Sequence, residues 1–406
     1  MVNTMTGINM NFSRAVKLGV SFSALTIVMA SANAKNIDAG KATIDLNLRY
    51  ESVEQDNAKK DAEALTLRTR LNYQLELNNS FTAVVEFEDS RALELDDYND
   101  TNGKNSDYSV IADPETTELD QGFLQYKAEQ FTAKIGRQVI TLDGQRFVGH
   151  VGWRQDRQTF DALNFAYTPV KDIAVNYSYI DKRNRIFAEA KDLQAKDHLL
   201  NASYTTSIGK FTGYAYLLEV DNNTDNALDT FGLSYSGNNK LADNTLFYRA
   251  EFATQTAESA GMEFDADYLT VEAGMAFSLF SAKVGLESLG SDDGNYGFST
   301  PLATLHKFNG FSDQFLNTPA QGLDDLYVSF SGKALSGNWA LAYHKFDANE
   351  PTGTIDDFGS EVNAVFSKGF AKHYSAGIKL ASYSAGDSDT EKVDTDKVWL
   401  WLGAKF

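Results

Sequence analysis

The chain has 406 residues, of which 43% are hydrophobic and 12% aromatic, and it carries a formal net charge of −20 with no cysteine. The lack of cysteine excludes disulfides, thiol catalysis and metal sites with Cys ligands. The negative charge argues against nucleic acid as a partner, because nucleic-acid binding depends on Lys and Arg that neutralise phosphate.

The N-terminus predicts secretion, because it combines a positive region, an apolar run and a small-residue cleavage pattern. These features are, in chain order, Arg14 and Lys17, residues 18–30, and Ala32-Asn33-Ala34. The apolar run is too short to span a membrane comfortably, which disfavours an anchor or a core helix. We therefore expect residues 1–34 to be a signal peptide and residues 35–406 to be the mature protein.

Along the mature chain, apolar and polar residues alternate with the two-residue period of a β-strand. The clearest stretches are residues 44–50, 65–77, 173–179, 246–252 and 326–331. About 18 segments of roughly ten residues can be distinguished, which suits a porin-sized barrel. The sequence predicts an all-β fold, a single transmembrane antiparallel β-barrel. A β-sandwich of this length would need two or three domains, and no linker divides the chain.

The connections alternate in length, as expected for short periplasmic turns and long extracellular loops. Short turns are predicted at residues 78–79, 169–170, 208–209 and 336–337. Long polar loops are predicted near residues 91–116, 142–157, 182–196, 291–322 and 386–396. Strand ladders need every backbone N–H, so proline is expected only in connections. We place all five there, namely Pro114, Pro169, Pro301, Pro319 and Pro351.

The C-terminus ends in an amphipathic segment with Phe406 as the last residue. Four apolar residues precede it on the same face, at Val398, Leu400, Leu402 and Ala404. Outer-membrane barrels typically end in this way, and the assembly machinery recognises the terminal aromatic. We expect an outer-membrane protein of a Gram-negative bacterium, with lipid and lipopolysaccharide around it and Phe406 as the contact for assembly.

A search for catalytic or metal-binding motifs finds little. The histidines are scattered and none has a neighbour at metal-ligand spacing, so we assign no catalytic residue, metal or cofactor and expect no enzyme. An active site assembled at the barrel rim remains an alternative. The acids between Asp96 and Asp107 could hold calcium, although Tyr98 breaks the EF-hand spacing. A solvated loop whose acids meet divalent ions bridging lipopolysaccharide is the simpler interpretation.

One region reverses the overall charge. Residues 134–157 carry five cations against Asp143 and Asp156, and the alternation places further cations on the polar faces of strands. The candidate pore-lining residues are Arg49, Arg68, Arg70, Lys134, Arg137, Arg146, Arg154, Arg157 and Arg249, with Lys283 and Lys379 on later strands. Guanidinium groups bind carboxylates bidentately without titrating, so a staggered set could pass anions between weak sites. Alternatively, each arginine pairs with an inward acid and fills the lumen.

Several stretches of the chain form a recognisable pattern. They are the motif Gly136-Arg137-Gln138 with its continuation to residue 149, Gly152-Trp153-Arg154-Gln155, residues 159–162, the loop 300–311, and residues 315–316 and 322–327. In these stretches the chain resembles the alginate-export family of outer-membrane porins. The resemblance implies a monomeric 18-stranded barrel with an arginine-rich lumen that passes a polyuronate. Through the motif, it carries Arg137, Arg146 and Arg154 over as lumen groups.

These observations lead to one functional prediction, an outer-membrane channel for anionic solutes. Uronate-type poly- or oligosaccharides are the expected cargo, and export of a polymer or uptake of small carboxylates fits the same features. A non-selective general porin is the alternative from the same location.

Overall fold

The structure is a computed structural model that describes residues 40–406. The signal peptide predicted for residues 1–34 lies outside the described residues and stays a prediction. The helical content of the described part is three short 3₁₀ turns, η2 (Glu189–Lys191), η3 (Leu305–Lys307) and η4 (Ser388–Thr390). In that part, no helix combines the length and apolar character needed to cross a membrane.

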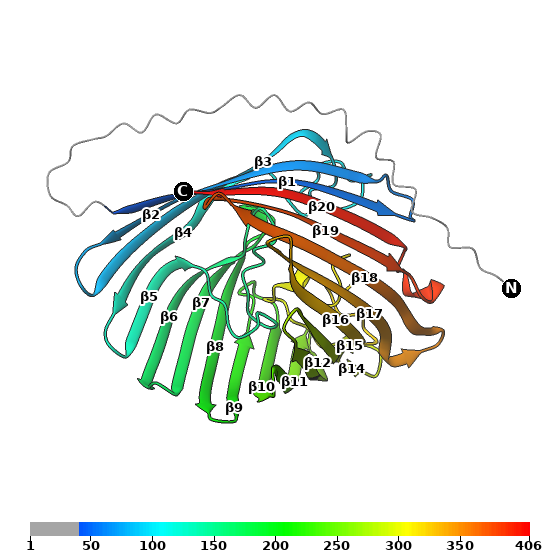
Figure 1. The fold of residues 1–406 in the computed structure, drawn as a ribbon. Helices are drawn as coiled ribbons and strands as arrows, with labels where there is room; N and C mark the ends of the chain where they lie inside the picture. The colour runs from blue at the N-terminus through cyan, green and yellow to red at the C-terminus, as the bar shows by residue number, and fades with distance from the viewer. Residues whose placement is uncertain (1–39) are drawn as a thin grey trace. The chain divides into compact units, whose positions relative to one another are not determined.

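Eighteen strands form one antiparallel sheet in which each strand pairs with its neighbours in the chain (Figure 1). The strands of this sheet are β1 (Lys41–Gln55), β2 (Ala62–Glu76), β3 (Phe81–Asp97), β4 (Thr116–Lys127), β5 (Phe131–Gln138), β6 (Thr159–Val170), β7 (Ile173–Asn184), β8 (Leu193–Thr206), β9 (Gly209–Leu218), β10 (Asn226–Leu241), β11 (Asn244–Ser259), β12 (Met262–Ala276), β13 (Phe280–Leu289), β16 (Leu323–Ala334), β17 (Gly337–Thr352), β18 (Ile355–Phe370), β19 (Tyr374–Ser384) and β20 (Thr395–Lys405). The two remaining strands of residues 40–406, β14 (Ser291–Asp292) and β15 (Tyr296–Gly297), form a small separate hairpin.

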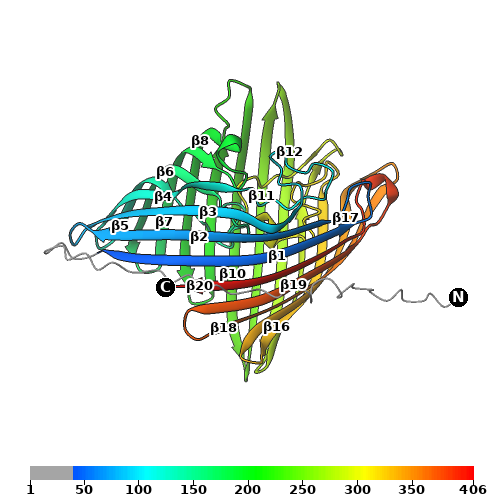
Figure 2. The same ribbon diagram turned by 90° about the horizontal axis from the view of Figure 1, so that it is seen from above.

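The sheet closes because β20 pairs with β1, which lies beside it in Figure 2. The backbones of Ile44 and Phe406 complete the seam, since each donates its N–H to the carbonyl of the other, at 3.0 and 2.9 Å. Closure leaves no unpaired edge, which a spanning sheet requires because lipid offers no hydrogen bonds. The predicted all-β barrel of about 18 strands is confirmed.

The two faces of each strand follow the alternation in the sequence. On β2, the outward Leu71 and Tyr73 are 49% and 46% exposed, whereas Thr66, Arg68 and Arg70 are buried. A single-layer barrel can bury a strand residue only on its inner side, so the polar faces of the strands point into the lumen.

Short and long connections alternate along most of the barrel, as predicted, but the connections at 260–261 and 353–354 are short where a long one is expected. The three longest all leave the same end, and we call them L2 (residues 98–115), L3 (139–158) and L7 (290–322). Two of the predicted proline positions are wrong, because Pro169 and Pro351 are the penultimate residues of β6 and β17. The ladders are irregular at both places, so a missing N–H is tolerated there. The turn predicted at residues 169–170 accordingly lies at 171–172.

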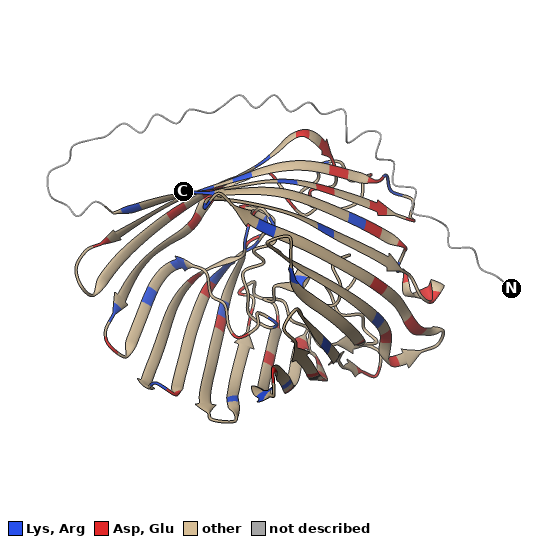
Figure 3. Cartoon of the chain, viewed as in Figure 1, with Lys and Arg blue, Asp and Glu red and all other residues tan. Residues whose placement is uncertain are grey.

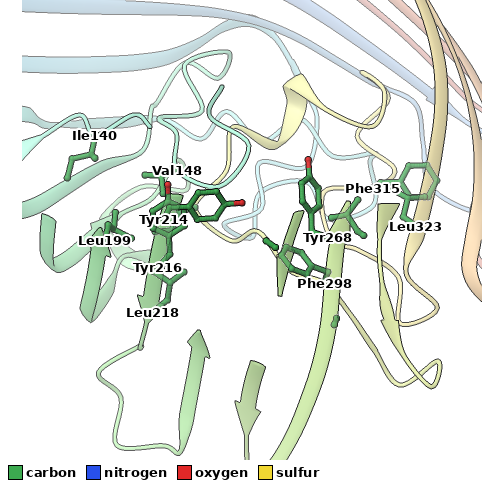
Figure 4. Packing of buried hydrophobic residues seen from close by; sticks show 14 of the residues in the cluster. Ile140, Val148, Leu199, Tyr214, Tyr216, Leu218, Tyr268, Phe298, Phe315 and Leu323 are labelled. Carbon is green, nitrogen blue, oxygen red and sulfur yellow. The ribbon is translucent and has the colours of Figure 1, made fainter. Parts of the chain in front are cut away.

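L3 and L7 fold into the barrel and pack on the inward aromatic residues of its wall, as the close view in Figure 4 shows. The hydrophobic core therefore lies in the lumen. Its fully or nearly fully buried members include Val148 from L3, Phe298 and Leu302 from L7, and Tyr214 and Tyr268 from the wall.

A short backbone bridge clamps L3 to L7. Val148 pairs with Leu302 in parallel, and the Gly149 N–H donates to the Leu302 carbonyl at 2.8 Å. A Cβ at Gly149 would lie 2.2 Å from Oγ1 of Thr304, so the close approach requires glycine. L2 packs separately, with Tyr98 and Ile111 buried against Val53, Ala62 and Ala64 of the wall.

We predict that the end bearing L2, L3 and L7 faces the cell exterior. Because the chain has no cysteine, single substitutions N102C in L2, D293C in L7 and N79C in a short turn can be labelled selectively. A membrane-impermeant maleimide should label N102C and D293C on intact cells, and N79C only after the outer membrane is opened. Labelling of N79C on intact cells would contradict the orientation.

Candidate functional site

Ion pairs between the lumen wall and the inward connections dominate the interior. At their centre, Arg154 of L3 donates to Glu51 of β1 at 3.1 Å and to Asp313 of L7 at 3.0 Å. Arg49 of β1 pairs with Asp113 of L2, and Lys397 of β20 donates to Asp313 at 3.0 Å. These charges hold L2, L3 and L7 to one side of the wall.

A second group of pairs joins L3 to β2, β3 and β4. Arg70 pairs with Glu88 and lies 3.6 Å from Asp120, and Arg157 of L3 donates to Asp120 at 2.6 Å and to Glu86. On the same face of β2, Arg68 pairs with Asp45 at 2.5 Å. Figure 3 shows basic and acidic residues interleaved along these strands.

Arg146 of L3 reaches the opposite wall. It donates to Glu287 of β13 at 2.8 Å, and to Thr300 and Asn309 of L7 at 3.0 and 3.2 Å. Its guanidinium also lies 4.9 Å from the ring centre of Phe308. Arg146, Glu287, Thr300 and Asn309 are all buried, so loss of either Arg146 or Glu287 would leave an unpaired charge in the interior.

His306 of L7 joins an aromatic stack to the wall. Its ring stacks on Trp153 of L3 at 5.1 Å, its Nδ1 lies 2.6 Å from Asp313, and its Nε2 lies 3.0 Å from Nζ of Lys379. The geometry suits a neutral ring that donates to Asp313 and accepts from Lys379. Burial lowers the pKa of His306 to about 3, against the opposing attraction of Asp313.

A cavity of about 350 Å³ lies between L7 and the wall formed by β11, β12, β13, β16, β17 and β18. Its basic lining residues are Arg249, Lys283, Lys307 and His344, and the rings of Phe308 and Tyr327 lie beside them. Three acids line it as well, and each has a basic partner: Glu272 pairs with Lys283, Glu287 with Arg146 and Asp325 with His344. A volume of this size suits a small solute with one or two rings.

The cations of this cavity differ in their pairing. Arg249 pairs with Glu251, and Lys283 donates to Glu272 at 2.8 Å. Lys307 forms no ion pair among residues 40–406, and its Nζ donates to the Gly144 carbonyl at 2.7 Å. Partial burial and the positive charges of Arg249 and Lys283 lower the pKa of Lys307. An anion in the cavity would relieve this repulsion.

Residues 41–285, more than half of the chain, match the protein family described as alginate export. The chain belongs to the alginate export family. A comparison with curated proteins finds no match.

Solved structures share the fold of this alginate export barrel at low sequence identity. OccAB4 of Acinetobacter baumannii has a TM-score of 0.72 and 11% identity, over 90% of this chain and 97% of its own. OpdK of Pseudomonas aeruginosa, solved with vanillate, has a TM-score of 0.70 and 14% identity, over 90% and 98%. OpdL of Pseudomonas aeruginosa has a TM-score of 0.70 and 12% identity, and the match covers 91% of this chain and 99% of OpdL. With the family match, the fold identifies an outer-membrane channel.

Most predicted pore-lining residues lie inside this alginate export barrel. Arg49, Arg68, Arg70 and Arg249 are on inward faces, and Arg146, Arg154 and Arg157 are on L3, which lies in the lumen. Lys134 of β5 forms no ion pair in the described part of the chain and lies 4.9 Å from the ring centre of Phe123.

Arg137 departs from the prediction because the structure places it on the outward face of β5. It lies two residues after Ile135, which is 57% exposed, so the two share a face. Opposite it on β6 is Asp161, which accepts from Arg137 at 2.7 Å. Similarity to the family motif predicts a lumenal Arg137, but a motif does not show which residues of β5 face inward and which face outward.

The acids between Asp96 and Asp107 do not converge on a common point. Asp96 pairs with Lys104 at 2.9 Å and Asp107 with Lys60 at 2.6 Å, whereas Asp100 accepts from backbone N–H groups of its own loop. In residues 40–406, the carboxylates that come close enough to share an ion are those of Glu88, Glu118 and Asp156.

Sequence reasoning missed His306, Lys307 and Phe308 as functional residues. They belong to the 300–311 stretch that carries the family resemblance, but neither charge nor periodicity distinguished them there. A loop has no alternation to indicate its faces, so only its inward path reveals these side chains.

We predict that R154Q destabilises the barrel by ~3–5 kcal/mol, because it leaves Glu51 and Asp313 buried with fewer cations. Unfolding by urea in detergent measures the change. The control R91Q removes an exposed pair with Asp89 and should cost below ~1 kcal/mol. Equal effects of the two substitutions would contradict the anchoring role of Arg154.

We predict that His306 titrates near pH 3 and not near 6.5. Because the docked state favours the neutral ring, its contribution to stability is complete above pH 6.5 and falls as the pH decreases toward 3. Protonation beside Trp153 should quench indole fluorescence, so an emission titration measures the transition. H306Q should abolish it, and a wild-type transition near pH 6.5 would contradict the prediction.

Proposed function

We propose that this alginate export barrel conducts small anionic solutes, uronic acids and related carboxylates, across the outer membrane of a Gram-negative bacterium. The observation that carries the proposal is Lys307, a cation without an acidic partner among residues 40–406, in a cavity also lined by Arg249 and Lys283. In a narrow passage, one unneutralised charge has a large effect on which ions enter.

The filled lumen favours small solutes over a polymer. L2, L3 and L7 are held to the wall by buried ion pairs, so an extended polysaccharide would have to displace several of them. A cavity of about 350 Å³ accommodates a single sugar acid or aromatic acid without such displacement. OpdK, which shares the fold, was solved with vanillate, an aromatic carboxylate.

The extensive pairing of the arginines favours a second candidate, a non-selective general porin. Arg49, Arg68, Arg70, Arg154 and Arg157 all have acidic partners. A neutralised guanidinium contributes little net field, so these residues fill and rigidify the lumen in this interpretation. The two candidates differ in the role that they give to Lys307.

Reversal potentials in planar bilayers under a salt gradient distinguish the candidates. We expect the wild-type channel to prefer anions and to be blocked by galacturonate and its short oligomers. K307Q should lower the anion-to-cation permeability ratio roughly two- to fivefold, the effect of ~0.5–1 kcal/mol at the constriction. It should weaken the block as well.

The matched control is K171Q, which removes an exposed cation in the short turn after β6 and should leave selectivity unchanged. A cation-selective wild type, or a K307Q channel indistinguishable from wild type, would support the general porin instead.

A further inference from the structure

Three of the four residues 154–157 of L3 find complementary partners on the wall. The two arginines pair with acids, and the amide of Gln155 donates to Oγ1 of Thr66 at 2.8 Å. Asp156 is the exception, because its carboxylate lies close to the carboxylates of Glu88 and Glu118. The contact of Asp156 with two other acids thus lies within a segment whose other residues bind the wall through complementary groups.

The three carboxylates converge, two of them buried and that of Glu118 half-buried. One oxygen from each lies within 4.8 Å of the others, and Glu88 and Asp156 are 1% and 2% exposed. Oε1 of Glu88 and Oδ2 of Asp156 are both buried without a hydrogen-bond partner. The hydroxyl of Ser90, two residues along the inward face of β3, is also buried and unpartnered. The unsatisfied oxygens of Glu88 and Asp156, which lie in the same carboxylate group, indicate a further group that completes their bonding.

Nearby cations do not balance this charge. Arg70 and Arg157 are shared among Glu88, Glu86 and Asp120. In the described part of the chain, neither Glu118 nor Asp156 pairs with a Lys or Arg. Burial, with the repulsion of Glu118 and Glu88, raises the pKa of Asp156 well above its ordinary value. The contact therefore needs either a bound proton or a bound cation.

We propose that Glu88, Glu118 and Asp156 bind a hard divalent cation, Ca²⁺ in the first place, which fastens L3 to β3 and β4. Carboxylate oxygens are the ligands that such ions prefer, and Ca²⁺ accepts irregular sets of six to eight oxygens, some of them from water. The ion neutralises the repulsion and satisfies the orphaned oxygens. Its effect on the channel is to hold L3 in its lumenal position.

The test uses the mature barrel refolded into detergent free of lipopolysaccharide and stripped with EDTA, so that no lipid-bound ion contributes. Calorimetric titration of CaCl₂ at pH 7.5 should show one saturable site per chain, and Ca²⁺ should raise the midpoint of thermal unfolding. D156N should lose the site, and in EDTA it should melt above the wild type because repulsion is relieved. E118Q provides a second variant should D156N fail to refold.

The matched control is D97N, which replaces an exposed acid at the L2 end of β3 and should keep the site. Wild-type protein without saturable Ca²⁺ binding at millimolar concentration would overturn the proposal, as would full binding by D156N or E118Q. The wild-type protein could instead show no binding of Ca²⁺ and become more stable in EDTA as the pH falls from 8 to 5. This result would also overturn the proposal, because it would show that a shared proton stabilises the contact among the three carboxylates. Anion selectivity is measured separately, so neither result depends on the proposed cargo.

Discussion

Charge pairing inside the closed barrel is the constraint on which the rest of the structure depends. A spanning sheet must turn its apolar side chains toward lipid, so its charged residues gather on the inner face. Charges removed from bulk water are costly unless paired. The connections supply the missing partners, as Asp113 does for Arg49 and Arg146 for Glu287. L2, L3 and L7 therefore lie inside the barrel because the wall is charged.

This arrangement explains why global charge says little about conduction. The chain carries −20 overall, but most charges of the lumen cancel in pairs, and the local balance depends on the few that do not. Lys307 of L7 and the group formed by Glu88, Glu118 and Asp156 are such exceptions, of opposite sign and beside different parts of the wall. The two proposals made for these groups therefore concern separate places in the lumen, because each unpaired group acts over a short distance in a crowded interior.

The comparison with OccAB4, OpdK and OpdL separates architecture from cargo. Identities of 11–14% accompany TM-scores of 0.70–0.72, since a closed antiparallel barrel needs only alternation, turns and a suitable strand number. The residues that line the cavity come from L7, from Gly144 of L3 and from inward strand positions. These can change without disturbing the ladders, so fold transfers between such proteins more safely than substrate does.

The sequence alone determined the barrel, the faces of its strands and the alternation of short and long connections. These features depend on local periodicity, as the exposed Leu71 beside the buried Arg70 illustrates. The sequence also predicted most of the lumenal arginines correctly, but the predicted positions of Arg137, Pro169 and Pro351 were wrong. Tertiary structure decided which charges pair, because Arg154 and Asp313 are 159 positions apart. The ion pairs of the lumen, the cavity at Lys307 and the cluster of three carboxylates around Asp156 depend on the path of L3 and L7 into the lumen. No local sequence pattern encodes that path.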